Sequence, residues 1–158
     1  MATPSRAQME VTASTRIAAA PERVWELVSD TSLFPEWVTA VAAVPRSDGP
    51  AREGATFDEL TQIMGPFRAK TRWTFIEFDP PRRMVWRSED LPFASEFFVI
   101  TEVAPSGDGS RVTSTLRARP SLGVLGASMY RIIKSQQRKD NERTVRKLAE
   151  LATADRPA

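Results

Sequence analysis

One long amphipathic helix, predicted near the C-terminal end, constrains the fold more than any other feature of the sequence. Residues 122–151 contain no proline, and their only two glycines lie near the start. Apolar residues recur there at helical spacing, at Leu125, Met129, Ile132, Ile133, Val145, Leu148 and Leu151. At 1.5 Å per residue, a helix of about 30 residues is roughly 45 Å long. A helix of this length needs an equally extended apolar surface on which to pack.

Segments typical of β-strands come before this helix. Residues 9–17 alternate between apolar and polar side chains, which is the pattern of a half-buried strand. Further strand-like runs, separated by turns rich in glycine, proline and aspartate, cover residues 55–64, 67–78, 84–88, 97–103 and 112–118. Between the first strand and these runs, Pro21 and Pro35 each lie in the first turn of a predicted short helix.

The order of these elements predicts the fold class. We expect an α+β protein in which the long helix covers a curved antiparallel sheet of about six or seven strands, because the apolar face of the sheet needs a partner of similar length. Two short helices follow the first strand. With 158 residues the chain fits one domain, predicted at residues 9–152, between a tail of residues 1–8 and another of residues 153–158.

Residue types that the chain lacks exclude several kinds of chemistry. There is no cysteine and no histidine, which rules out disulfides, thiolate nucleophiles, histidine general bases and metal sites built on either residue. No metal and no cofactor is expected. Carboxylates, lysines, arginines, hydroxyl groups and the single tyrosine remain as groups for catalysis.

Charge and hydropathy bear on partners and location. The net charge of +2 is weak support for a nucleic-acid partner, and none is expected. No segment approaches the ~20 apolar residues of a membrane span. Residues 1–8 lack the apolar core of a signal peptide, so we expect a cytoplasmic protein.

Three motifs, in the same order along the chain, resemble those of a known family. Residues 17–30 read IAAAPERVWELVSD and are followed by FPEW at 34–37. Residues 75–86 read FIEFDPPRRMVW, and residues 107–113 read GDGSRVT. Together they resemble the polyketide cyclase/dehydrase and lipid-transport family of the START-like superfamily.

This resemblance implies a helix-grip fold, with a hydrophobic cavity between the sheet and the C-terminal helix. Similar proteins include aromatic polyketide cyclases, lipid and sterol carriers, hormone receptors and a ribosome-directed toxin, so the fold alone does not select one function. The aromatase/cyclases typically have an arginine a few residues before the Asp-Pro turn. This chain has Phe75, Ile76 and Glu77 there, which weakens the case for cyclisation of the aromatase type.

Large aromatic side chains are the first candidates for the cavity wall. Trp73 and Phe75 share one face of a predicted strand, and Trp86 lies on the next one. Of the adjacent Phe97 and Phe98 only one can face inward, and the other meets solvent or a second subunit, so a monomer or a homodimer is expected. The aromatic candidates for ligand contact are Trp37, Phe57, Trp73, Phe75, Trp86 and Phe98. The alternative is that these rings simply fill the core.

The middle of the long helix is polar, with no aliphatic or aromatic residue from 135 to 144. An apolar stripe that stops for two turns indicates a segment facing either a polar cavity or solvent. Steps of three and four from Ile133 reach Gln136 and Gln137, then Asp140 and Asn141. The helix candidates for ligand contact are Met129, Tyr130, Ile133, Gln137 and Asn141.

Three functions remain open at this level. The first is a non-catalytic carrier of a lipid, quinone or polyketide-like molecule. The second is a cofactor-independent polyketide cyclase or dehydratase, which needs a carbonyl-polarising group and a proton carrier. Its candidate groups are Arg72, Arg87, Arg117, Glu59, Glu77, Asp140 and Tyr130. The third is a module that binds the ribosome or RNA through the basic face of the long helix.

Overall fold

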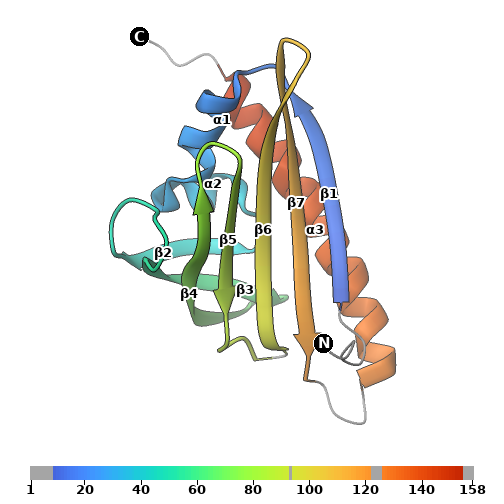
Figure 1. Ribbon diagram of the computed structural model, residues 1–158. Coiled ribbons are helices and arrows are strands. Elements are labelled where there is room, and N and C mark those ends of the chain that lie inside the picture. Colours follow the sequence, from blue (N-terminus) through green and yellow to red (C-terminus); the bar gives the residue numbers. More distant parts are fainter. Residues whose placement is uncertain (1–8, 93, 122–125, 155–158) are drawn as a thin grey trace, which may run out of the picture.

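Seven strands and a long C-terminal helix make up most of the residues described by the computed structural model, which are 9–92, 94–121 and 126–154 (Figure 1). Along the chain the elements are β1 (Met9–Ile17), α1 (Pro21–Val28), the 3-10 helix η1 (Thr31–Leu33), α2 (Phe34–Trp37), β2 (Val41–Ser47), β3 (Thr56–Met64), β4 (Phe67–Asp79), β5 (Arg83–Ser88), β6 (Ala94–Ser106), β7 (Gly109–Pro120) and α3 (Gly126–Thr153). This order confirms the predicted α+β class.

All seven strands form one antiparallel sheet in the order β1-β7-β6-β5-β4-β3-β2. Strands β2 to β7 follow one another as a meander, and β1 closes the far edge beside β7. In Figure 1, α3 runs along one face of the sheet behind β7 and β1, while β2 and β3 run across the direction of β6 and β7. Helix α3 also packs on α1 and α2, so all three helices lie on the concave side.

Irregular register positions help the sheet to curve. The pairing shifts within β2–β3, between Phe75 and Glu77 in β4, and between Ala94 and Glu96 in β6. Such bulges increase local twist and bend the strand that carries them. The curved sheet therefore has an inner face toward α3 and an outer face away from it.

Strand β2 is the one strand that the sequence patterns did not predict. Its seven residues include Pro45 and do not alternate cleanly between buried and exposed. Proline cannot donate to a strand ladder, but it is tolerated in an edge strand, which β2 is. The predicted start of the long helix, residues 122–125, lies outside the described residues, as do the predicted tail 1–8 and residues 155–158 of the other predicted tail.

The GDGSRVT motif of residues 107–113 builds the β6–β7 hairpin. Gly107 has φ +59°, a conformation that favours glycine. A Cβ on Gly109 would lie 2.3 Å from the carbonyl oxygen of Ile17, so β1 and β7 approach too closely there for a side chain. The hydroxyl of Ser110 donates to the carbonyl of Ala19 at 2.5 Å. The motif therefore serves the connection between β1 and β7.

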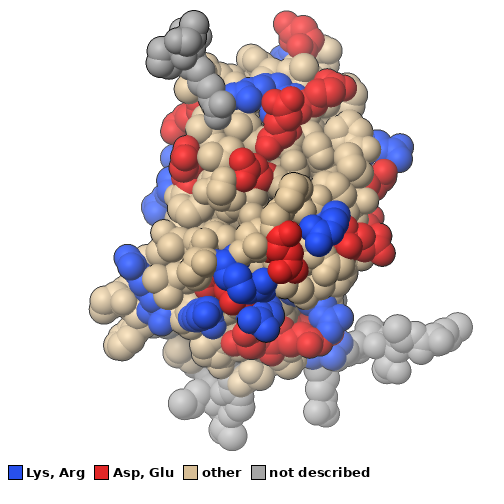
Figure 2. Space-filling model, turned by 90° about the vertical axis from the view of Figure 1, so that its left-hand side faces the viewer, with Lys and Arg blue, Asp and Glu red and all other residues tan. Residues whose placement is uncertain are grey.

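Charged residues of both signs are spread over the side of the molecule that carries β2, between uncharged areas (Figure 2). Figure 2 shows acidic side chains prevailing on the upper part of this side and Lys and Arg side chains prevailing on the lower part. Among the described residues, no helix combines the length and the apolar composition needed to cross a membrane.

Candidate functional site

Alternate residues of neighbouring strands form a wall that faces α3. In the β3–β4 pair, Phe57 lies opposite Trp73, and Glu59 lies opposite Thr71. All four side chains are buried. Because side chains of a strand alternate between its two faces, Asp58 points to the outer face. The inner face of β3 and β4 therefore presents aromatic and polar groups side by side.

These residues help to enclose a cavity between the sheet and α3. This inner cavity has a volume of about 70 Å³, which is room for several water-sized groups. It shares Ala40, Gln62, Gln137 and Asp140 with an outer groove of about 370 Å³ that also touches Arg143. Together the inner cavity and the outer groove reach the volume range typical of small-molecule sites.

Aromatic rings hold the walls of the inner cavity in place. The ring of Phe34 stacks on Trp86 with centroids 5.4 Å apart and meets Trp37 edge-on at 5.6 Å. Trp73 meets Phe97 edge-on at 5.8 Å. Such contacts add stabilisation beyond the burial of apolar area. Two of these five residues come from α2 and three from the sheet, and all five contribute to the cavity lining.

A chain of hydrogen bonds crosses the polar part of this wall. The indole Nε1 of Trp73 donates to the hydroxyl of Thr71 at 2.9 Å. The hydroxyls of Thr71 and Thr61 are 2.7 Å apart, and Thr61 donates to Oε1 of Glu59 at 2.9 Å. An indole can only donate, so the arrangement that gives each hydroxyl hydrogen an acceptor runs from Trp73 through Thr71 and Thr61 to Glu59.

Glu59 is a buried acid without a cationic partner among the described residues. Burial raises the pKa of its carboxyl group to about 7, and the hydrogen bond from Thr61 acts in the opposite direction. Below that pH the group is a neutral carboxylic acid, which can donate as well as accept a hydrogen bond. Glu59 also belongs to the lining of the inner cavity.

Two other residues of the lining each carry a buried polar atom that has no hydrogen-bond partner. These atoms are Nε1 of Trp37, in a residue only 2% exposed, and Oγ1 of Thr101, in a residue only 1% exposed. No other buried side-chain nitrogen or oxygen of the described residues lacks a hydrogen bond. A buried polar group left unpaired costs about 1–3 kcal/mol. The residues around this cavity therefore retain two unused hydrogen-bonding groups.

Helix α3 closes the cavity with its polar middle, as one of the two sequence interpretations predicts. Gln137, Asp140, Asn141 and Thr144 belong to the lining. Asn141 is buried and donates through Nδ2 to the carbonyl of Ser114 at 2.8 Å. The hydroxyl of Thr144 accepts from the backbone N–H of Thr39 at 3.0 Å. These two bonds fix α3 to β7 and to the segment after α2.

The structure brings five of the eleven predicted ligand-contact residues together around the inner cavity: Trp37, Trp73, Trp86, Gln137 and Asn141. Ile133 lines the outer groove. Phe57 and Phe75 are fully buried behind the lining, with ring centroids 5.4 Å apart.

The other three predicted residues lie elsewhere. Tyr130 packs on the core from α3, and Met129 is half-buried on the same helix, but neither lines the inner cavity. Phe98 lies on the outer face of β6, opposite Arg87 and Arg117 in the neighbouring strands. Its neighbour Phe97 takes the inward position.

Several lining residues were not identified from the sequence, namely Phe34, Thr61, Phe97 and Thr101. Neither was Thr71, whose hydroxyl forms hydrogen bonds with Thr61 and Trp73. For Thr71 a signal existed, because it lies two residues before Trp73 and so shares its face. Thr61 and Thr101 depend on pairing between strands, which a single strand pattern does not specify. The choice between Phe97 and Phe98 depends on the bulge after Ala94, which changes the facing of β6.

The arginines considered for catalysis all lie on the outer face. Arg72 bonds Asp58 at 2.8 Å, Arg117 bonds Glu10 at 2.9 Å, and Arg87 pairs with Glu89. Glu77 likewise pairs with Arg83 at 2.8 Å. None of these groups lines the inner cavity, so a cavity-facing arginine is missing among the described residues.

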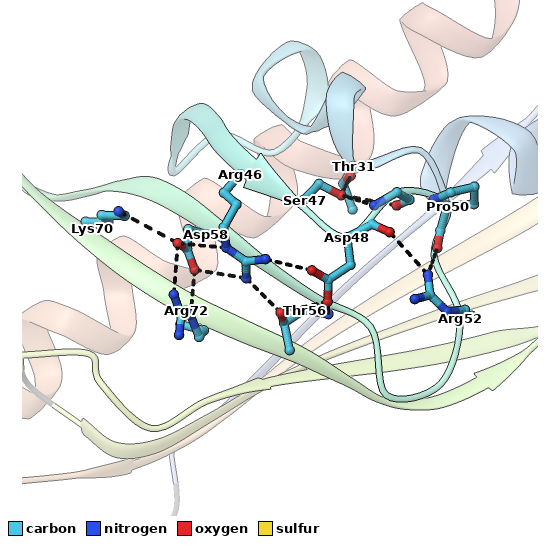
Figure 3. A network of polar contacts seen from close by, with 11 residues as sticks. Thr31, Arg46, Ser47, Asp48, Pro50, Arg52, Thr56, Asp58, Lys70 and Arg72 are labelled. Carbon is cyan, nitrogen blue, oxygen red and sulfur yellow. Dashed lines mark hydrogen bonds and ion pairs between the residues drawn. The ribbon is translucent and has the colours of Figure 1, made fainter.

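Asp58 is the centre of a polar network on the outer face (Figure 3). Its side chain is 2% exposed and accepts from Nε of Arg72 at 2.8 Å and from Nε of Arg46 at 3.1 Å, with Nζ of Lys70 3.7 Å away. Hydrogen bonds from Arg72 and Arg46 hold the pKa of Asp58 well below its usual range. Arg46 also bonds Asp48 at 2.7 Å. The network joins β2, β3 and β4 behind the cavity wall.

Comparison with known proteins identifies related sequences and folds. The sequence model of a family described as polyketide cyclase/dehydrase and lipid transport matches residues 8–153. The crystal structure of TTHA0849 from Thermus thermophilus has 22% identity and a TM-score of 0.74, covering 90% of this chain and 96% of that one. No curated protein sequence matches the chain.

Two other solved structures extend this comparison. The di-domain ARO/CYC BexL from the BE-7585A biosynthetic pathway has 19% identity and a TM-score of 0.73, covering 94% of this chain and 51% of that one. Ara h 8.0201 has 8% identity and a TM-score of 0.66, covering 94% of this chain and 100% of that one. At these identities the likeness shows a shared fold.

Proposed function

The chain belongs to the polyketide cyclase/dehydrase and lipid-transport family, and from that premise we propose that it binds a small amphipathic molecule in the inner cavity. Lipids, quinones and polyketide-like compounds are the candidate classes. The bound molecule would place its polar group between the sheet and α3 and extend through the outer groove. Hydrophobic ligand binding is what the family suggests, and the cavity offers a place for it.

One observation carries this proposal: the unpartnered Nε1 of Trp37 and Oγ1 of Thr101 within an aromatic-walled cavity. If these two residues only filled the core, replacing the unpaired polar group by an apolar one would make the protein more stable. A ligand oxygen that reached both atoms would remove both penalties. The rings of Trp73, Trp86 and Phe97 supply flat apolar surface beside them.

Native mass spectrometry on protein purified from its own host tests this proposal, followed by denaturing extraction of any bound molecule. We expect a stoichiometric adduct of a lipid, quinone or polyketide-like mass. In a Val99→Trp variant, whose indole fills the cavity, the adduct should disappear. The matched Phe98→Trp variant changes the next residue, on the outer face, and should retain it. An adduct that survives in both variants, or is absent from the wild-type protein, contradicts the proposal.

A cyclase or dehydratase is the second candidate, and Glu59 is the observation that favours it. In a dehydration, Glu59 would protonate the leaving hydroxyl as the C–O bond breaks, and its carboxylate would then take the proton from the adjacent carbon. A pKa of about 7 suits a group that must give and take a proton near neutral pH.

Turnover of β-hydroxy ketone probes distinguishes the two functions. A dehydratase should release water from such a probe in the wild-type protein and lose that activity with Glu59→Gln. It should retain the activity with Glu77→Gln, which changes a carboxylate that pairs with Arg83 outside the cavity lining. Binding of the probe without any turnover favours the carrier.

A further inference from the structure

The inner cavity contains acidic groups and no basic group. Among the described residues that line it, Glu59 and Asp140 are the ionisable ones, and no lysine or arginine is present. Arg46 and Arg72, on the strands that flank β3, are turned away from Glu59, because both pair with Asp58 on the outer face. An anion that entered this cavity would lose its hydration without gaining a counter-charge, which is strongly unfavourable.

The other charged groups of the surrounding elements do not change this balance. Glu36 of α2 is exposed, and Asp140 of α3 accepts a hydrogen bond from Gln136 at 2.9 Å. Arg143 of α3 touches the outer groove but not the inner cavity. The charged side chains of the strands that form ion pairs do so away from the cavity lining: Glu10, Arg16, Arg46, Asp58, Lys70, Arg72, Glu77, Asp79, Arg83, Arg87, Glu96, Glu102, Arg117 and Arg119.

The hydrogen-bonding atoms of the lining favour a ligand that accepts. Nε1 of Trp37 is a donor only, and its lack of a partner calls for an acceptor on the ligand. Oε1 of Glu59 already accepts from Thr61, so a proton on this carboxyl group belongs on Oε2, from which it can be donated. The hydroxyl of Thr101 can donate or accept.

Building on the proposed function, we propose that the inner cavity takes an uncharged oxygen-bearing group, such as a ketone, quinone or lactone carbonyl. This group accepts hydrogen bonds from Nε1 of Trp37 and from the carboxyl group of Glu59, and the cavity rejects carboxylates and phosphates. The charge on the ligand is thereby selected by the inner end of the site, while Arg143 can meet an anion only at the outer groove.

Ionisation of Glu59 gives the proposal a pH dependence. Burial raises the pKa of this group to about 7, so its proton is present below that pH and absent above it. A carbonyl ligand loses one donor when Glu59 ionises. Its affinity should therefore fall as the pH rises through about 7.

Three probes that share one ring system test the selection by charge: 2-acetonaphthone, 2-naphthoate and 2-naphthylmethylamine. The ketone and the carboxylate have nearly the same shape, so only charge and hydrogen bonding separate them. Isothermal titration calorimetry at about pH 6 should show a Kd for the ketone that is at least about tenfold lower than the Kd for the carboxylate. Equal affinity for the two would overturn the proposal, and so would tighter binding of the amine, because Glu59 would then serve as a counter-ion.

Two variants locate the probes within the site. Arg143→Gln should abolish residual binding of the carboxylate, which would show that the anion was held at the outer groove. Glu59→Gln should remove the pH dependence of ketone binding between about pH 6 and pH 8.5. A carboxylate that binds tightly in the Arg143→Gln variant contradicts the proposal, as does a pH dependence that survives in Glu59→Gln.

The same titrations separate this inference from the function on which it rests. If all three probes bind equally well, the cavity binds small molecules without selecting their charge, so this inference fails and the proposed function stands. If none binds and no bound molecule is extracted from the native protein, both fail.

Discussion

Asp58 and Glu59 are consecutive residues of β3 whose carboxyl groups lie on opposite faces of the sheet, and their pKa values are shifted in opposite directions. Asp58 accepts hydrogen bonds from Arg46 and Arg72, which lower its pKa. Glu59 meets the inner cavity and the hydroxyl of Thr61, and burial raises its pKa to about 7. One strand thus keeps a permanent anion outside and a titratable acid inside.

The Glu59→Gln variant should alter how stability depends on pH. The folded protein holds the proton of Glu59 up to about pH 7, whereas the unfolded chain releases it near the ordinary value of 4.5. The contribution of Glu59 to the free energy of unfolding is therefore most favourable below about pH 4.5. As the pH rises to about 7, this contribution decreases by roughly 3 kcal/mol in total.

Urea denaturation of both proteins between about pH 4.5 and pH 8 measures this effect. The difference in unfolding free energy, variant minus wild type, should grow with pH and level off above about 7. Parallel pH profiles for the two proteins contradict a buried, titrating Glu59.

The Asp58→Asn variant should be destabilised, because Arg46 and Arg72 lose their shared carboxylate. Both arginine side chains are partly or largely exposed, so solvent screens their attraction to the carboxylate. We therefore expect the free energy of unfolding to fall by on the order of 1–2 kcal/mol at neutral pH. The pKa of Asp58 is lowered, so its contribution is present above about pH 4 and disappears as the pH falls below that value.

Asp108→Asn provides the matched control for this measurement, because Asp108 pairs with Arg16 at the exposed β6–β7 turn. This control should have almost no effect on the urea midpoint. Equal effects of the two substitutions would show that the network around Asp58 has no structural role.

The Thr101→Val variant should become more stable and bind less well. The substitution removes a buried hydroxyl that has no partner and keeps the branched shape of the side chain. Thermal unfolding should show a gain of about 1 kcal/mol, and the affinity for 2-acetonaphthone should fall by up to about tenfold.

Thr115→Val is the control for that variant, because Thr115 lies on the neighbouring strand and its hydroxyl bonds Thr12 at 3.2 Å outside the cavity. It should leave affinity unchanged. A Thr101→Val protein that loses stability and binds the ketone as before would contradict a ligand contact at Oγ1.

Much of the fold could be predicted from the sequence because local patterns specify it. The alternation of residues 9–17 predicted β1, and helical spacing predicted most of α3. The edge strand β2 could not be found, since Pro45 and a mixed burial pattern hide it. Gln137 and Asn141, which the polar middle of α3 suggested as ligand contacts, both belong to the lining of the inner cavity.

The chemistry of the site was harder to predict, because it depends on contacts between strands. The sequence offered Glu59 and Glu77 as equivalent single carboxylates. Their different environments follow from register: Glu59 lies opposite Thr71 in a regular part of the β3–β4 pair, while Glu77 lies beyond a register shift and meets Arg83. The bulge in β6 similarly brought Phe97 inward in place of Phe98.

The most direct test of the account follows the four tryptophan indole N–H signals by ¹H–¹⁵N NMR while 2-acetonaphthone is added. Trp37, Trp73 and Trp86 line the inner cavity, whereas Trp25 packs on Phe78 at 5.5 Å and provides the internal reference. The account predicts that the Trp37 signal, whose N–H has no partner in the free protein, moves downfield more than the other three, and that Trp25 stays in place. A Trp37 signal that remains unchanged while the ketone binds would contradict a ligand oxygen in the inner cavity.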